Sequence, residues 1–308
     1  MDRTRQYDPA VPPTVDASPG AVAVSKPDPP PVAKPVVEIS PERRSLTFAN
    51  LEELWDFREV LWGFTVRAVK VKYKQAVIGV GWALIQPTLA ALVFALIFGR
   101  LAKLPTQGDT PYLLFALAGM TCWAYVNTAV TTSSQSLVTD ETLLRKVYFP
   151  REVIPLGAIG AALVDFGPGL VVLLVVAGLY GALPALSWVT LPVLVLILIV
   201  TSTAVGLTLS GLNVYYRDVK HAIPFLLQMG LFASAIVFPL SLLDEPWATV
   251  YGIANPVAGT VDGVRRVVTE GNWPDPLLTA GGLVWASILL VAGYALFERL
   301  ERGFGDRV

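Results

Sequence analysis

The sequence predicts an all-α integral membrane protein with six transmembrane helices. An amphipathic cytoplasmic interface helix precedes them, and short re-entrant or interfacial helices precede the last span. Two observations support this class. Of the 308 residues, 54% are hydrophobic and only 15% are charged, with a mean hydropathy of +0.59, which exceeds what the core of a soluble domain needs. The apolar residues also form uncharged runs, and a membrane-spanning helix needs roughly 20 such residues.

Charge and rare residues exclude several function classes. A formal charge of −1 argues against nucleic acid as a partner. One cysteine, Cys122, and one histidine, His221, leave no basis for a disulfide within the chain, a metal cluster or most nucleophile–histidine pairs. We therefore expect no metal site and no catalytic residues.

Residues 1–46 are predicted to be a disordered, proline-rich cytoplasmic tail. The first 41 residues contain ten of the 24 prolines and show no helical or strand periodicity. They lack the apolar core of a secretory signal, so we expect the tail to be retained.

Residues 47–75 are predicted to form the amphipathic interface helix, because apolar residues recur there at three- and four-residue spacing. Acidic residues come early on the other face and basic residues late, which suits the helix dipole. Such a helix lies along the headgroups of the inner leaflet. Alternatively, it is a solvated helix that serves only as a topology signal. The interface residues are Arg67, Lys70, Lys72 and Tyr73.

The six-span domain covers residues 76–300, and a tail of residues 301–308 follows. The predicted spans are 76–100, 111–136, 153–182, 188–214, 221–243 and 276–298. When the N-terminal tail is left out of the count, this arrangement places 13 Lys and Arg residues on one side of the membrane and four on the other. Because cations concentrate on the cytoplasmic side, both termini are predicted to be cytoplasmic.

Two connectors are unusual. The first contains Arg145, Lys146 and Arg151, three cations within seven positions, and we expect a cytoplasmic partner to contact it. The second, residues 244–275, is long and largely apolar but too short to cross the membrane. It is predicted to form two short re-entrant or interfacial helices broken at Asn255-Pro256. Alternatively, it is a surface loop whose aromatic residues dock on headgroups.

Residues 50–303 resemble the permease subunit of ABC-2-type exporters of lipid-linked polysaccharides. Seven segments carry this resemblance in order: Lys70-Val-Lys-Tyr-Lys74, Ile78-Gly-Val-Gly-Trp-Ala-Leu-Ile-Gln-Pro87, Phe98-Gly-Arg-Leu-Ala-Lys103, Pro111-Tyr112, Lys146-Val-Tyr-Phe-Pro-Arg-Glu152, Leu212-Asn-Val-Tyr-Tyr-Arg-Asp-Val219, and Asn255-Pro256 followed by Arg265.

The resemblance implies a homodimer on two copies of an ABC nucleotide-binding subunit. This chain has no Gly-x-x-x-x-Gly-Lys-Ser/Thr loop, so it is expected to carry no cofactor, with ATP and Mg on the partner subunit. Residues 139–149 then correspond to the coupling helix, with Thr139 as its N-cap. The residues expected to contact the ATPase are Thr139, Asp140, Glu141, Leu144, Arg145, Lys146 and Tyr148.

A sugar polymer needs a protein-lined path, because stranded hydroxyls are costly in hydrocarbon. Aromatic faces at a dimer seam would let the polymer slide, although aromatic residues in spans also serve as packing or lipid-facing residues. The candidates are Trp82, Phe94, Phe98, Trp123, Tyr125, Phe232 and Phe238. The external gate is assigned to Trp247, Tyr251, Asn255, Pro256 and Arg265.

One carboxylate lies within a predicted span, and the chain departs from the family pattern at a few positions. Asp165 lies about a dozen residues into the third span, and we expect it to support the helix near Pro168. Related permeases commonly have a proline and a tyrosine where this chain has Ala235 and Phe238. They also have an asparagine at the start of the coupling helix, near Asp140 here.

The predicted function is export of a lipid-linked polysaccharide across the plasma (inner) membrane of a bacterium by a multi-pass permease that contacts membrane lipids. O-antigen, galactan, teichoic acid and capsule are candidate polymers. Two alternatives are an ABC-2 exporter of a small amphiphile or drug and a membrane-embedded glycosyltransferase. The second is disfavoured because the sequence has no Asp-x-Asp motif or paired external carboxylates.

Overall fold

The computed structural model describes residues 54–74, 79, 81–108, 110–146, 149–182 and 184–304, all within one compact unit, Ser45–Val308. The described residues form helices, turns and irregular segments, with no strand among them. The predicted tail 1–46, the start of the interface helix, Tyr148 and the last four residues lie outside the described residues, as do the side chains of 144–146.

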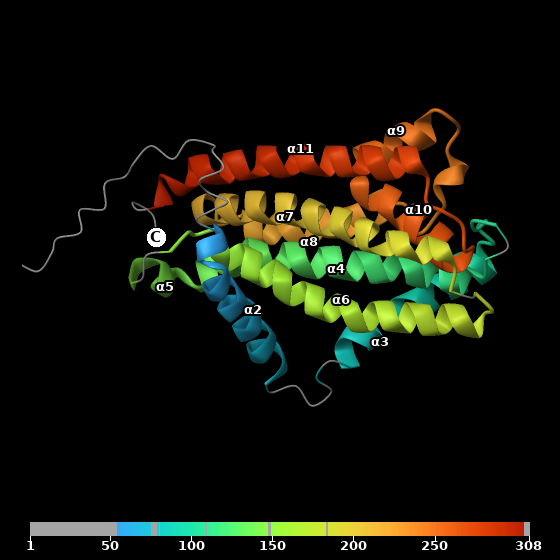
Figure 1. The fold of residues 1–308 in the computed structure, drawn as a ribbon, viewed down its shortest axis with the longest axis horizontal. Helices are drawn as coiled ribbons and strands as arrows, with labels where there is room; N and C mark the ends of the chain where they lie inside the picture. Colours follow the sequence, from blue (N-terminus) through green and yellow to red (C-terminus); the bar gives the residue numbers. More distant parts are fainter. Residues whose placement is uncertain are drawn as a thin grey trace, which may run out of the picture. The chain divides into compact units, whose positions relative to one another are not determined.

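Five of the described helices are long and apolar enough to cross a membrane. Figure 1 shows most of them side by side, and the helix that begins at Gly81 is partly hidden behind the others. They are α3 (Gly81–Phe94) continued by the π-helix η1 (Ala95–Leu101), α4 (Tyr112–Thr139), α6 (Val153–Leu179), the 3-10 helix η2 (Leu186–Thr190) with α7 (Leu191–Tyr215), and α11 (Pro276–Glu301).

Helix α2 (Arg58–Tyr73) occupies the predicted interface segment and packs along the first half of α6. Its apolar residues Leu61 and Phe64 join a buried cluster that includes Leu137, Val153 and Phe297. Lys70 and Lys72 occupy its last turn, where cations suit the negative end of the helix dipole.

The segment predicted as the fifth span is not one continuous helix. Helix α8 (Val219–Ala233) has 15 residues and ends ten residues before the predicted end at position 243. The backbone turns where Ala235 adopts φ of 52°, and a 3-10 turn, η3 (Leu240–Leu242), follows. An L-residue in this region carries a steric cost from its Cβ. The described residues therefore contain five long apolar helices and one shorter apolar helix.

Two short helices fill most of the segment 244–275. Helix α9 (Trp247–Ala254) and helix α10 (Pro256–Thr269) meet at Asn255-Pro256, the predicted break. Proline is favourable there because the first residue of a helix needs no amide donor. Both helices lie at one end of the bundle, called here the α10 end, and the short helix α5 (Glu141–Lys146) marks the opposite, α5 end (Figure 1).

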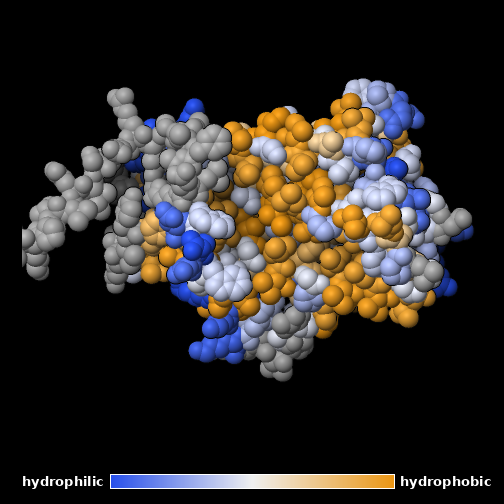
Figure 2. All heavy atoms as spheres, in the orientation of Figure 1, coloured by the Kyte–Doolittle hydropathy of each residue, from blue (hydrophilic) through white to orange (hydrophobic). Residues whose placement is uncertain are grey.

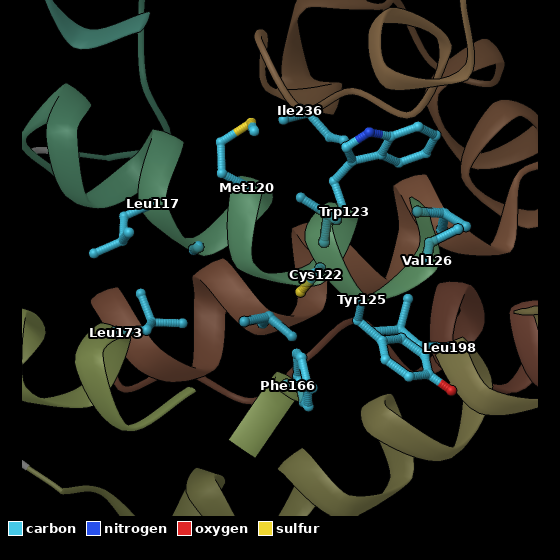
Figure 3. Packing of buried hydrophobic residues seen from close by; sticks show 14 of the residues in the cluster. Leu117, Met120, Cys122, Trp123, Tyr125, Val126, Phe166, Leu173, Leu198 and Ile236 are labelled. Carbon is cyan, nitrogen blue, oxygen red and sulfur yellow. The ribbon is translucent and has the colours of Figure 1, made fainter. Parts of the chain in front are cut away.

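Helix α4 lies at the centre of the bundle and supplies much of the main buried cluster. Figure 3 shows Trp123 and Tyr125 of α4 pointing to opposite sides of the helix, towards Ile236 and Leu198 respectively. On the face shown in Figure 2, hydrophobic side chains cover the middle of the bundle and hydrophilic ones gather towards its ends. This distribution suits a bundle surrounded by hydrocarbon.

Candidate functional site

At the α5 end, the predicted coupling segment is tied to the predicted interface helix. Arg67 of α2 donates to Asp140 at 3.0 Å, in an ion pair whose side chains are 52% and 21% exposed. Asp140 is the C-cap that follows α4, and its backbone carbonyl accepts from the amide of Leu143 in α5. The structure thus brings together one residue from each of the two predicted cytoplasmic sites.

The expectation that Thr139 caps α5 is wrong. Thr139 is the last residue of α4, and its hydroxyl donates back to the carbonyl of Gln135 at 2.9 Å. Threonine in a helix commonly makes this bond to the residue four positions earlier. Glu141 begins α5, an acidic residue in the first turn as expected from the helix dipole.

The connector after α5 is anchored by an aromatic residue that the sequence did not single out. Phe149 is buried, and its ring lies 5.5 Å from that of Phe64 of α2. Two residues on, Arg151 donates to the carbonyl of Glu301 at 3.2 Å and stacks over the ring of Phe304. The connector therefore contacts both α2 and the end of α11.

Asp165 of α6 is the centre of a second site. Its carboxylate accepts from the ammonium of Lys72 and the phenol of Tyr73, both in the last turn of α2. Burial raises the pKa of Tyr73 above its ordinary value, and the hydrogen bond to Asp165 and the negative charge of Asp165 raise it further. The expected role near Pro168 is corrected: Asp165 joins α6 to the interface helix.

The cavity beside Asp165 also places this residue relative to the first long apolar helix. Gly81–Leu101 contains 21 residues. At a rise of about 1.5 Å per residue they span about 31 Å, close to the thickness of the hydrocarbon core. Trp82 and Gln86, in the first turns of this segment, line the same cavity as Asp165. Asp165 therefore lies beside the first turns of α3, and its bonds to Lys72 and Tyr73 compensate a charge that would be costly in hydrocarbon without partners.

This cavity has a volume of about 270 Å³ and lies between α2, α3, α4 and α6. Its wall combines charged, amide, hydroxyl and aromatic side chains with small and apolar residues such as Ala83, Pro87 and Ala162. The polar and aromatic ones include Lys72, Tyr73, Trp82, Gln86, Tyr125 and Asp165. The described residues contain no group of three or more His, Cys, Asp or Glu side chains that is able to hold a metal ion.

The seven aromatic candidates for a polymer path fall into different environments within the single chain. Trp123 and Tyr125 are buried in the main cluster, and a Cβ at Gly230 of α8 would lie 2.8 Å from the Trp123 ring. Phe94 and Phe98 pack edge to face at 5.7 Å, and Phe238 is partly buried at the α10 end. Trp82 and Phe232 are about half exposed.

At the α10 end, Arg265 of α10 is 1% exposed and binds the backbone beyond the end of α8. Its guanidinium donates to the carbonyls of Ala235 at 2.8 Å, Ile236 at 2.7 Å and Phe115 at 3.2 Å. It also lies 3.4 Å from the centre of the Phe115 ring. Gly119 of α4 makes room, since a Cβ there would lie 2.8 Å from the guanidinium.

Two further predicted gate residues, Tyr251 and Asn255, bind the end of α8. Together with Arg265 they form a clamp on the segment that follows this helix. The carbonyl of Ala233 accepts from the Asn255 amide at 2.7 Å and from the Tyr251 phenol. The Asn255 oxygen also caps α10 by accepting from the amide of Ala258 at 3.3 Å. Helix ends inside a membrane protein need such partners for their last carbonyls. Pro256 is buried at the start of α10, whereas Trp247 at the start of α9 is exposed.

Comparison with known proteins places the chain in a family. The model of the family described as ABC-2 type transporter matches residues 59–268, more than half of the chain. The chain belongs to the ABC-2 type transporter family. This ABC-2 family member is therefore an integral membrane protein, in agreement with its five long apolar helices.

Relatives of this ABC-2 chain match it over nearly their whole lengths. The O-antigen export system permease protein RfbA of Myxococcus xanthus is 28% identical over 84% of this chain and 98% of its own length. An RfbA of Klebsiella pneumoniae is 26% identical over 83% and 96%, respectively. The polysialic acid transport protein KpsM of Escherichia coli is 22% identical over 77% and 91%.

Sequence reasoning missed the contacts of this ABC-2 chain that depend on tertiary packing. Tyr112 of α4 donates to the carbonyl of Val237 at 2.6 Å and thus adds to the clamp around Arg265. The motif Pro111-Tyr112 is part of the family resemblance, but the hydrogen-bond partner of Tyr112 lies 125 positions away. Phe149 likewise lies in a segment of that resemblance, and its aromatic character in a charged connector was the available signal.

Proposed function

We propose that this chain is the permease subunit of an ATP-driven exporter that moves a lipid-linked polysaccharide from the cytoplasm across the plasma (inner) membrane. The observation that carries the proposal is the match to polysaccharide-transport permeases over almost their full lengths. The relatives are named for O-antigen and polysialic acid, so a cell-surface glycan is the substrate class that we propose here.

We place ATP and Mg on a separate nucleotide-binding subunit present in two copies. Support comes from the sequence, which has no phosphate-binding Gly-x-x-x-x-Gly-Lys-Ser/Thr loop. The docking surface on this chain is the α5 end. There, Glu141 and Thr142 of α5 are exposed and the Arg67–Asp140 pair connects α5 to α2. Both termini are then cytoplasmic, as the distribution of Lys and Arg predicts.

We place the polymer path at a seam between two copies of the chain. A sugar polymer needs polar or aromatic walls, because each unsatisfied hydroxyl in hydrocarbon costs several kcal/mol. Helix α3, its continuation η1 and helix α8 expose broad apolar surfaces in the single chain, including Leu89, Leu96, Phe225 and Phe232. A second copy would cover such surfaces. In this arrangement α8 and the clamped segment after it make the sixth crossing, and α9 and α10 form the outer gate.

The test is depletion of the protein in its host, followed by isolation and sugar analysis of lipid-linked glycans from the cytoplasmic side. The proposal expects a long lipid-linked polymer to accumulate inside while its surface form disappears. If no glycan accumulates and the cells instead become sensitive to hydrophobic compounds, the chain exports a small amphiphile and the polysaccharide proposal fails.

A further inference from the structure

We propose that the cavity between α2, α3, α4 and α6 binds an uncharged sugar residue of the transported glycan at the cytoplasmic boundary of the membrane. This inference rests on the proposed function and adds to it a binding site within each protomer, apart from the seam between copies. It depends on the shape of the cavity, its balance of charge and the free hydrogen-bonding groups in its wall.

The position of the cavity suits a ligand that arrives from the cytoplasmic leaflet. Its volume is about 270 Å³, and four helices contribute to its wall. Lys72 and Tyr73 come from the end of α2, and Trp82 and Gln86 from the first turns of α3. The cavity thus lies where the interface helix ends and the first span begins. Trp82 is 49% exposed, so one side of the wall is open to a ligand.

The charges in the wall favour a neutral ligand over an anion. Lys72 and Asp165 form an ion pair and are the cavity's lining residues of opposite charge. A carboxylate offers about four lone-pair sites, of which the Lys72 and Tyr73 bonds use two, and an ammonium has three donors. Spare donors and spare acceptors therefore lie side by side. A hydroxyl both donates and accepts, so it fits this pairing, whereas a phosphate would face the carboxylate.

Two further polar groups in the wall lack partners among the described residues. The amide of Gln86 is exposed on α3, and the hydroxyl of Thr128 lies partly buried on α4; neither side chain makes a hydrogen bond to that part of the chain. An amide near hydrocarbon is costly unless a partner satisfies it. Together with the indole of Trp82, whose face can cover sugar C–H groups, they complete a wall suited to a sugar ring.

The first experiment is photocrosslinking in host cells that carry the complete transporter. Benzoylphenylalanine replaces Gln86, and in a control it replaces Val291, which is 65% exposed on α11 away from the cavity. The proposal expects a crosslinked product at position 86 that reacts with a stain for glycans, and none at position 291. A product at position 86 that contains only phospholipid, or only a second copy of the chain, would overturn it.

A second experiment uses Gln86→Leu, with Gln135→Leu as the matched control, since Gln135 is an exposed glutamine of α4 outside the cavity. One hydrogen bond to the ligand corresponds to about a fivefold change in occupancy. We expect export at limiting substrate to fall by about that factor in Gln86→Leu, with an unchanged unfolding temperature, and to stay at the wild-type level in the control.

Unchanged export in Gln86→Leu, or a fall in export that follows a fall in unfolding temperature, would overturn the cavity proposal. Failure of the proposed function is a separate result, because depletion of the whole protein would then leave glycan export intact. Loss of export on depletion together with normal export in Gln86→Leu would reject the cavity alone.

Discussion

The two ends of the bundle hold their helices together in different ways. At the α5 end, the link is an ion pair between partly exposed side chains, Arg67 and Asp140, which are 52% and 21% exposed. At the α10 end, the link is the fully buried guanidinium of Arg265, which donates to three backbone carbonyls. At the α5 end, water can take the place of either partner in the ion pair. At the α10 end, water does not reach the guanidinium or its carbonyl acceptors.

The difference has an energetic consequence. An exposed ion pair contributes about 0.2–1 kcal/mol, so it can break and re-form at little cost. A buried charged donor stripped from its acceptors costs several kcal/mol, because the carbonyls stay unsatisfied. We therefore expect α2 and α5 to move relative to the bundle during transport, while α4, α8 and α10 keep their contacts near Arg265.

The largest expected effect is that of Arg265→Met. Three backbone carbonyls lose their donor inside the protein, and hydrogen bonds to charged groups contribute about 1.5–3 kcal/mol each. We expect a loss of more than about 3 kcal/mol in the free energy of unfolding, measured by denaturant unfolding in detergent. Arg265→Lys should lose most of the same stability, since an ammonium lacks the planar fork that reaches several carbonyls.

Arg58→Met is the control for this change, because Arg58 is exposed and donates to one carbonyl, that of Trp55. It should shift unfolding by no more than about 0.5 kcal/mol. Equal stability of the two methionine variants would show that the hydrogen bonds of Arg265 do not hold the α10 end together.

The next largest effect is expected for Ala235→Pro. Ala235 has φ of 52°, whereas the proline ring fixes φ near −65°. The variant should lose more than about 1 kcal/mol in the same unfolding measurement. Ala235→Gly is the matched control and should be tolerated, since glycine adopts positive φ without steric cost. A stable proline variant would mean that the positive φ of residue 235 is not needed for the turn that follows α8.

The early end of α8 also shows what the sequence alone could not predict. The five long helices follow from uncharged runs of sufficient length, and the junction of α9 and α10 follows from Asn255-Pro256. The run 221–243 is equally uncharged, yet α8 ends at Ala233 without a glycine or proline there. The partners of this end, Tyr251, Asn255 and Arg265, come from later in the chain, so no local pattern announces it.

Asp165 illustrates the same limit in the middle of α6. The predicted span 153–182 places Asp165 about a dozen residues from its start, which favours a carboxylate inside the membrane. The sequence does not fix its depth, because the 27 residues of α6 exceed what a span needs and the excess could lie at either end. Only the packing of α2 along α6 places Lys72 and Tyr73 beside Asp165. The residue type was noticeable in the sequence, but its depth and its partners depend on the tertiary structure.

A smaller effect is expected for Tyr73→Phe, which removes the hydrogen bond to Asp165. At pH 7 the variant should lose about 1 kcal/mol of unfolding free energy. The folded state raises the pKa of Tyr73 above the ordinary value of about 10. The folded state therefore holds the proton more tightly, and this contribution is present below pH 10 and is lost as the pH rises through the raised pKa.

The difference between wild type and Tyr73→Phe should accordingly shrink above about pH 10. Tyr180→Phe, at a half-exposed tyrosine at the end of α6, is the control and should match wild type at pH 7. A difference that stays constant into the alkaline range would show that the phenol does not donate to Asp165.

The smallest expected effect on stability belongs to the Arg67–Asp140 pair. Arg67→Asp should cost about 0.2–1 kcal/mol, and less at high salt, because both side chains are partly exposed. Its effect on transport should be larger than its effect on stability, since the pair joins the interface helix to the coupling segment. The reversed pair, Arg67→Asp with Asp140→Arg, should recover export measured as surface glycan. If the single variant exports normally, α2 and α5 do not move through this contact, and the contrast between the two ends is structural only.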